Sequence, residues 1–159
     1  MNAQERSFFL KDDGQIPNNP ELPVIVYEGI FSDNPNEIES AFNRHNWGGS
    51  WSGGIYDYHH YHSNAHEVLG VKSGNATVLL GGDAGEHLAL KAGDVMLLPA
   101  GTGHKLIQSS EDFEVVGAYP EGSSRICGNG IPLFVHSHWQ RSGMSRFLKL
   151  TQFMGIAAR

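Results

Sequence analysis

The chain has 159 residues, with 17 acidic against 11 basic side chains and a net charge of -6. That length fills one hydrophobic core well and is short for two ordinary domains. The acidic balance argues against a surface that tracks nucleic-acid phosphates and against anchoring to anionic lipid. The first residues lack the apolar core of a signal peptide, and no later window approaches the roughly 20 apolar residues of a membrane span. The sequence therefore predicts a cytoplasmic protein with no nucleic-acid and no membrane partner.

Twenty glycines punctuate short apolar runs along the chain. Glycine supplies the positive φ that tight turns need, so this pattern predicts many strands joined by turns, in a sandwich or closed barrel. One helix is expected over residues 33–47, where Asp33 or Asn34 precedes Pro35 and apolar residues follow at helical spacing. The helix should cover one end or face of the barrel. The predicted strands span residues 22–27, 55–61, 67–72, 76–80, 87–90, 95–98, 104–107 and 113–119.

Histidines are concentrated at one place, where His59, His60, His62 and His66 fall within eight positions beside Glu67. Alternate side chains of an extended strand share a face, so His60 and His62 point one way and His59 points the other way. After a turn at 63–65, Glu67 opens an alternating run. If its face is the interior, a carboxylate arrives beside two imidazoles. His66 falls on the opposite face, as a surface histidine or one that supports a ligand from behind.

A second cluster runs from Gly93 to His104. A turn at Gly93 launches an apolar strand, a second turn around Pro99 ends it, and His104 opens the next strand. His104 can complete the set, because three neutral imidazoles and one carboxylate suit divalent Fe, Mn, Ni, Co or Zn. Such a set leaves two positions of an octahedral ion for water, substrate or dioxygen. The alternative interpretation is a hydrogen-bonded polar cluster in a barrel that has lost its metal.

The spacing of these two clusters resembles the two motifs of the cupin superfamily. The resemblance covers about residues 55–120 and has one departure, because Gln108 stands where an asparagine is usual. The first motif is matched by His60, His62, Glu67 and Gly74, and the second by Gly93, Pro99, Gly101 and His104. A closer likeness, to the small bacterial group of YjlB-like cupins, extends the match to residues 8–125 through the segments 9–14, 60–63, 66–71 and 116–122. That group carries no known reaction.

The resemblance implies an all-β fold, the cupin double-stranded β-helix or jelly-roll barrel, with a short N-terminal helix. It implies one divalent transition metal, Fe, Mn, Ni or Zn, on His60, His62, Glu67 and His104, and a homodimer. Three regions are expected. Residues 1–50 supply a strand and a helix that pack on the barrel, residues 51–122 form the barrel core, and residues 123–159 form a C-terminal tail.

Two functions are consistent with such a site. The first is a small metalloenzyme acting on a small oxygen-rich molecule, by dioxygen addition or isomerisation, with Tyr58 moving protons. Tyr56 and Tyr58 share the face of His60, although aromatic strand residues are nearly as common in a plain core. The second function is a non-catalytic module that captures a small ligand for sensing or storage. A fused DNA-binding segment would favour sensing, and the sequence has none.

The last part of the chain has an unusual composition, because residues 123–159 contain no acidic residue. A basic tail for a partner is one explanation. Another is a shift of reading frame near Gly128–Gly130, since codons for 143–155 can be chosen whose alternative frame is acidic and proline-rich, similar to the ends of YjlB-like chains. On this hypothesis His136 and His138 are discounted as ligands, and Cys127, the only cysteine, has no role.

Overall fold

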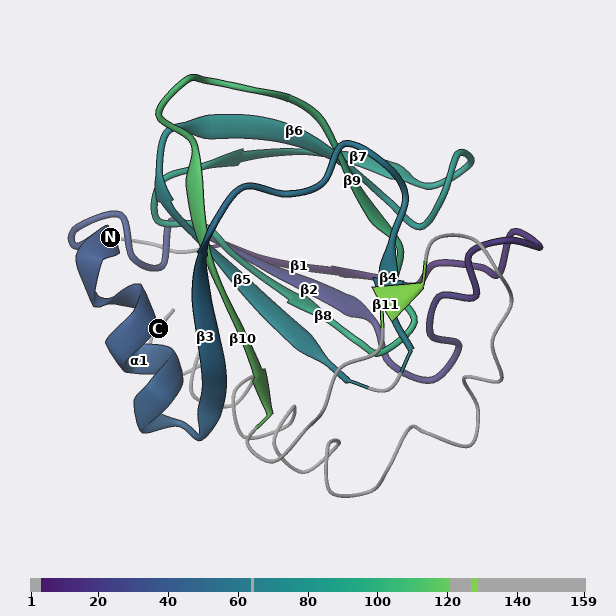
Figure 1. Cartoon of the computed structure of the whole chain (residues 1–159), viewed down its shortest axis with the longest axis horizontal. Coiled ribbons are helices and arrows are strands. Elements are labelled where there is room, and N and C mark those ends of the chain that lie inside the picture. Colours follow the sequence, from purple (N-terminus) through teal and green to yellow (C-terminus); the bar gives the residue numbers. More distant parts are fainter. Residues whose placement is uncertain (1–3, 64, 121–126, 129–159) are drawn as a thin grey trace.

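The computed structural model describes residues 4–63, 65–120 and 127–128. Within these ranges the chain is mostly strand, with one short α-helix (Figure 1). The elements are β1 (Gln4–Phe8), β2 (Val24–Glu28), a 3-10 turn (Pro35–Glu37), α1 (Ile38–Arg44), β3 (Trp47–Gly53), β4 (Tyr61–His62), β5 (Glu67–Ser73), β6 (Asn75–Leu80), β7 (Glu86–Lys91), β8 (Val95–Leu98), β9 (His104–Ser109), β10 (Glu114–Pro120) and β11 (Cys127–Gly128). The predicted all-β jelly-roll with a short helix is confirmed.

The strands form two main antiparallel sheets that face each other. Six strands are ordered β1-β2-β8-β5-β10-β3, three are ordered β7-β6-β9, and β4 pairs separately with β11. The three-stranded sheet lies over one face of the larger sheet, and α1 lies on the other side (Figure 1). The central strand β5 therefore has one face toward the second sheet and one toward the helix, whereas the edge strand β1 is mostly exposed.

Strand β5 shows how alternation divides the core. Val68 belongs to the cluster that includes Phe42 of α1, whereas Leu69 and Val71 belong to the cluster between the sheets. Glu67 shares the inward face of Leu69 and Val71 because side chains alternate along a strand. The predicted interior face of this run is confirmed, and it delivers a carboxylate to the space between the sheets.

The predicted helix over 33–47 exists but is shorter. Its α-helical part spans Ile38–Arg44 and buries Ile38, Ala41 and Phe42 against the larger sheet. Asn46 has a φ of +66°, a left-handed conformation that stops a helix, and Trp47 already belongs to β3. The helical spacing of apolar residues was therefore the right signal, and the extension to residue 47 was wrong.

The predicted strand over 55–61 is wrong except at its last residue. The structure has β3 at Trp47–Gly53 instead, which pairs with β10 as the edge of the larger sheet. Beyond it residues 54–59 carry no strand, His60 makes an isolated bridge to His104, and β4 covers only Tyr61–His62. With β3 already paired to β10, residues 54–60 run from the edge of the larger sheet to β4 as an irregular connection.

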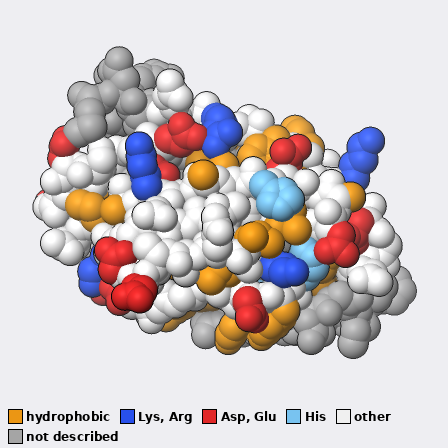
Figure 2. Space-filling model, turned by 90° about the horizontal axis from the view of Figure 1, so that it is seen from above, with side chains coloured by type: hydrophobic (Ala, Val, Ile, Leu, Met, Phe, Trp, Pro, Cys, Tyr) orange, Lys and Arg blue, Asp and Glu red, His pale blue; other side chains and the backbone are white. Residues whose placement is uncertain are grey.

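The described surface mixes both charge signs. Acidic and basic side chains are interspersed over the face seen in Figure 2. Among the described residues, no helix combines the length and the apolar character that crossing a membrane requires. Most of the predicted C-terminal tail, including His136 and His138, lies outside the described residues, apart from the pairing of Cys127 with His62 and of Gly128 with Tyr61.

Candidate metal centre

Three chain segments bring the predicted ligands together. Glu67 is the first residue of β5, His62 ends the short β4, and His104 is the first residue of β9. The backbone of His60 is tied to that of His104 by two hydrogen bonds, of 3.2 Å from His60 N to His104 O and of 2.9 Å from His104 N to His60 O. Residues more than 40 positions apart therefore meet at one end of the space between the sheets.

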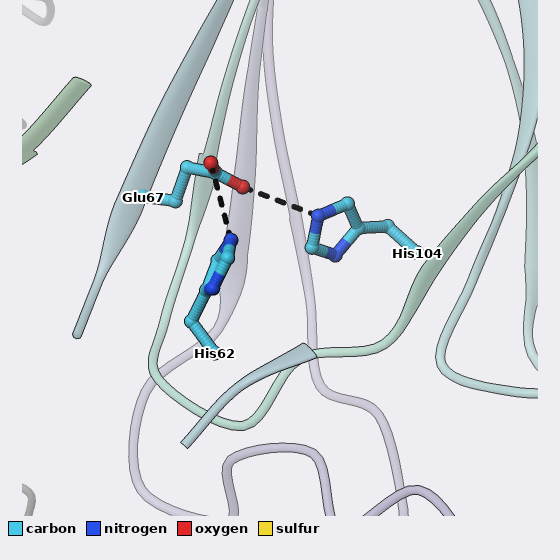
Figure 3. A group of neighbouring side chains, drawn as sticks. All are labelled: His62, Glu67 and His104. Carbon is cyan, nitrogen blue, oxygen red and sulfur yellow. Dashed lines mark ion pairs between the residues drawn. The ribbon is translucent and has the colours of Figure 1, made fainter. Parts of the chain in front are cut away.

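The side chains of His62, Glu67 and His104 form a compact cluster able to bind a metal. Their ligand atoms all lie within 4.8 Å of one another. His62 Nε2 is 3.4 Å from Glu67 Oε2, and His104 Nε2 is 3.1 Å from Glu67 Oε1 (Figure 3). Glu67 and His104 are buried, and the side chain of His62 is 10 % exposed. Two imidazoles and a carboxylate with their ligand atoms turned to a common point are a donor set for a divalent transition metal.

The tautomer of His104 follows from its second ring nitrogen. His104 Nδ1 lies 3.0 Å from the carbonyl oxygen of Thr102, and a carbonyl can only accept, so the proton of a neutral ring is on Nδ1. His104 Nε2 then presents a lone pair to Glu67 Oε1, a buried oxygen without a hydrogen-bond donor. Two lone pairs at 3.1 Å repel each other unless a cation stands between them, either a proton or a metal ion.

His60 has the same arrangement but lies beside the cluster rather than in it. Its Nδ1 donates to the carbonyl of Tyr58 at 3.1 Å, which leaves Nε2 as the acceptor in a neutral ring. The ring centroid is 4.0 Å from that of His104 and 6.2 Å from that of His62, and His60 is not in the group of three. Burial and the neighbouring His104 lower the pKa of His60 to about 3, so the ring stays neutral. Its place as a fourth ligand stays a prediction.

Glu67 is held in its charged form. Burial alone would raise the pKa of this carboxyl, but His104 and His62 beside it outweigh burial and hold the pKa well below its ordinary value. This lowering comes from N–H groups and positive charge on the two rings, so it describes the state in which the rings are protonated toward Glu67. An ionised carboxylate in this position can serve as an anionic ligand.

The four predicted ligands line one cavity of about 360 Å³. Tyr119 and apolar residues such as Ile55 and Leu69 also line the cavity, so a few polar groups converge in a mostly apolar lining. Cavities of this size and lining hold small molecules.

Sequence reasoning missed two residues behind Glu67. Tyr119, near the end of β10, donates its hydroxyl proton to Glu67 Oε2 at 2.6 Å, and Trp51 Nε1 on β3 donates to that hydroxyl at 2.9 Å. Tyr119 lies in the predicted strand 113–119, where alternation puts it on the same face as Gly117. This pattern could have identified the tyrosine as a residue of the site. Trp51 had no such signal, because the glycine-rich segment around it was not predicted as a strand.

The other aromatic and histidine predictions have separate outcomes. Tyr58 is 46 % exposed, its ring stacks on Tyr56 with centroids 4.9 Å apart, and of the two it is Tyr56 that lines the cavity. The proton-transfer role of Tyr58 stays a prediction. His59 is not part of the cluster, and its Nε2 pairs with Asp83 Oδ1 at 2.7 Å. His66 is buried, not on the surface, and its Nδ1 accepts the backbone N–H of Ala100 at 2.9 Å.

Comparison with known proteins identifies the family. Residues 50–117 match the cupin domain model. The chain is 45 % identical over 122 residues to "Uncharacterized protein YjlB" of Bacillus subtilis (strain 168), an alignment that covers 77 % of this chain and 73 % of that protein. The chain therefore belongs to the cupins. Within them it is a small member of the YjlB-like group, as its motifs indicate.

Solved structures share parts of the barrel at low identity. A dTDP-4-dehydrorhamnose 3,5-epimerase from Elizabethkingia anophelis NUHP1 is 12 % identical, with a TM-score of 0.48 over 81 % of this chain and 80 % of that one. An acireductone dioxygenase from Bacillus anthracis, with a cadmium ion in its active centre, is 16 % identical, with a TM-score of 0.41 over 61 % of this chain and 66 % of that one. Neither likeness assigns a reaction to this chain.

Proposed function

We propose that this cupin binds one divalent transition metal through His60, His62, Glu67 and His104. One observation carries the proposal: His104 Nε2 lies 3.1 Å from Glu67 Oε1. A neutral His104 ring has its only N–H on Nδ1, where it donates to the carbonyl oxygen of Thr102, so Nε2 has no proton to give to Glu67. A cation bound between them relieves the repulsion of the two lone pairs. Both His60 and His104 donate Nδ1–H to a backbone carbonyl, the support that metal-binding histidines commonly have.

The donor set favours the borderline metals. Three imidazoles and a carboxylate suit Fe, Mn, Ni or Zn, and cellular supply decides among them as much as affinity does. When bound, such an ion supplies Lewis acidity toward an oxygen-bearing ligand. The residues around it hold the ligand set in place, exclude bulk water and keep Glu67 ionised.

The activity we propose is that of a small metalloenzyme acting on a small oxygen-rich molecule, of the dioxygenase or isomerase type. A cavity of about 360 Å³ is near the lower end of the range for small-molecule sites, which favours a compact substrate. Tyr58 is proposed to move protons, since its ring centroid lies 5.8 Å from that of His60, which lines the cavity. A non-catalytic module that binds a small ligand is the alternative that the experiment distinguishes.

The test begins with the metal content of protein purified without added metal. We expect close to one ion per chain in the wild type and at least a tenfold loss in His62→Ala. His87→Ala, which removes an exposed histidine on β7, is the matched control and should keep its metal. Full retention of metal by His62→Ala would overturn the site.

Oxygen uptake against small diols and keto acids then separates the two functions. Iron in the protein together with oxygen consumption supports a dioxygenase, and conversion of a substrate without oxygen uptake supports an isomerase. Bound metal with no turnover of any of these compounds would contradict the proposed enzyme and leave the binding module as the function.

A further inference from the structure

The two oxygens of Glu67 have different surroundings. Oε2 accepts the hydroxyl proton of Tyr119 at 2.6 Å and lies 3.4 Å from His62 Nε2, whereas Oε1 is buried without any hydrogen-bond donor and faces His104 Nε2 at 3.1 Å. A buried carboxylate oxygen without a donor is costly unless something positive lies against it. The carboxylate is therefore anchored at one oxygen and available at the other.

The direction of the Tyr119 hydroxyl is fixed by Trp51. An indole N–H can only donate, so at 2.9 Å the Tyr119 oxygen must accept from it. The single proton of the hydroxyl is then directed to Glu67 Oε2. The three side chains form a one-way chain of hydrogen bonds that ends on the carboxylate.

Gly117 makes this chain possible. Trp51 on β3 and Gly117 on β10 are cross-strand partners, and the indole lies over the glycine. A Cβ added at Gly117 would come within 2.5 Å of the indole Nε1, too close for any side chain to be accommodated without moving the ring. Only glycine lets the indole lie close enough to β10 to reach Tyr119, two residues further along the strand.

We propose that Tyr119, directed by Trp51, is a positioning residue that occupies Glu67 Oε2, so that Glu67 binds the metal through Oε1 alone. This inference rests on the proposed metal site. Its consequence is the number of free positions on an octahedral ion, because three histidines and one carboxylate oxygen leave two, whereas a carboxylate bound through both oxygens leaves one. Two free positions fit a ligand that binds through two adjacent oxygens.

The first test compares Tyr119→Phe with wild type in metal affinity and in the infrared difference spectrum between metal-bound and metal-free protein. We expect affinity for Ni²⁺ to fall about tenfold. The separation of the two carboxylate stretching bands, assigned by their loss in Glu67→Gln, should be wide in wild type and narrower in the variant, as Oε2 is released to the metal. Tyr27→Phe is the matched control, since Tyr27 is buried in the cluster on the helix side of the sheet.

The second test is a double-mutant cycle, which separates positioning from a general structural role. If Tyr119 acts through Glu67, the Tyr119→Phe change should cost little Ni²⁺ affinity once Glu67→Gln is present. Ni²⁺ is suited to this test because imidazoles alone bind it well enough to measure. An equal loss in both backgrounds would overturn the inference.

Gly117→Ala gives an independent route that leaves Tyr119 and Glu67 unchanged. The added methyl group should displace the indole and reproduce the narrowed carboxylate bands of Tyr119→Phe in a protein whose far-ultraviolet spectrum is unchanged. Wild-type bands in both Tyr119→Phe and Gly117→Ala would contradict the positioning role while leaving the metal site intact. If the wild type itself binds no metal, it is the proposed function that fails.

Discussion

His104 Nε2 lies 3.1 Å from Glu67 Oε1, yet the two atoms share no hydrogen bond. In a neutral ring the proton is on Nδ1, where the Thr102 carbonyl accepts it at 3.0 Å. The contact between these two atoms is therefore favourable only when His104 is protonated on both nitrogens or when a metal ion replaces the second proton. This relationship favours a cation against Glu67 in either state, so we expect a bound metal to stabilise the fold.

Removal of metal should lower the melting temperature. A ligand that binds only the folded state stabilises it by about 2.7 kcal/mol at a hundred times its dissociation constant. We expect a chelator to lower the melting temperature of the wild type by several degrees and to leave that of His104→Ala unchanged. Differential scanning calorimetry with His87→Ala as the control measures this, and an equal chelator effect on His104→Ala would contradict the assignment.

Whether the metal has three or four protein ligands depends on whether His60 binds it. His60 lies beside the three-residue cluster, with its Nε2 available because Nδ1 donates to Tyr58 O. As a fourth ligand, His60→Ala should lower metal affinity at least tenfold, close to the effect of His62→Ala. Competition with a chromogenic chelator gives both values. Affinity within twofold of wild type in His60→Ala would leave a three-residue site.

Gly70 should be intolerant of even one methyl group. A Cβ there would lie 2.5 Å from Ile38 Cγ2 and 3.1 Å from Phe42 Cζ, both on the helix side of the sheet. We expect Gly70→Ala to lower the free energy of unfolding by about 1–3 kcal/mol. Gly48→Ala on β3 has open space around the new methyl group and should be neutral or slightly stabilising. Urea unfolding of both variants tests this, and equal stabilities would show that α1 does not pack on β5 as described.

Asp94 gives a pH dependence remote from the metal centre. Burial raises the pKa of its carboxyl, and backbone N–H donors from Lys91 and Gly29, at 2.9 and 2.7 Å, offset only part of this. Because the pKa is higher in the folded state, the folded protein keeps the Asp94 proton at pH values between the two pKa values, where the unfolded chain has lost it. The resulting stability is present below about pH 4 and is lost as the pH rises through the folded pKa.

The variant Asp94→Asn isolates this effect because an amide does not titrate in that range. We expect the free energy of unfolding of the wild type, measured relative to Asp94→Asn in the presence of a chelator, to decline as the pH rises from 4 to 7. A difference that grows over the same interval would mean that the backbone donors outweigh burial.

Most of the fold could be predicted because local residue types, glycine above all, mark its turns. The turns around Gly74 and Gly93 have φ of +73° and +98°, and the strands on either side of them fall within a residue or two of the predicted limits. Strand β3 could not be predicted in this way. Between Trp47 and Trp51 the strand has only glycines and a serine, so it lacks the alternation of apolar and polar residues that predicts a strand. Its pairing with β10 is a long-range contact that no local pattern shows.

The site was predicted by motif spacing rather than by secondary structure. The assumption that His60 and His62 share a strand is wrong, yet both line the cavity because the bridge to His104 fixes the backbone of His60. The hydrogen bond of Tyr119 to Glu67 joins residues 52 positions apart on two strands. No local pattern encodes such a contact, so the residues that support the ligands emerge only from the folded chain.

The position of the metal tests the account most directly. Crystals of the protein as purified, measured at the absorption edge of the metal that elemental analysis finds, should give one anomalous peak per chain, about 2.0–2.2 Å from the Nε2 atoms of His62 and His104 and from Glu67 Oε1. An anomalous peak elsewhere, or none between these side chains in protein that contains metal, would contradict the central claim.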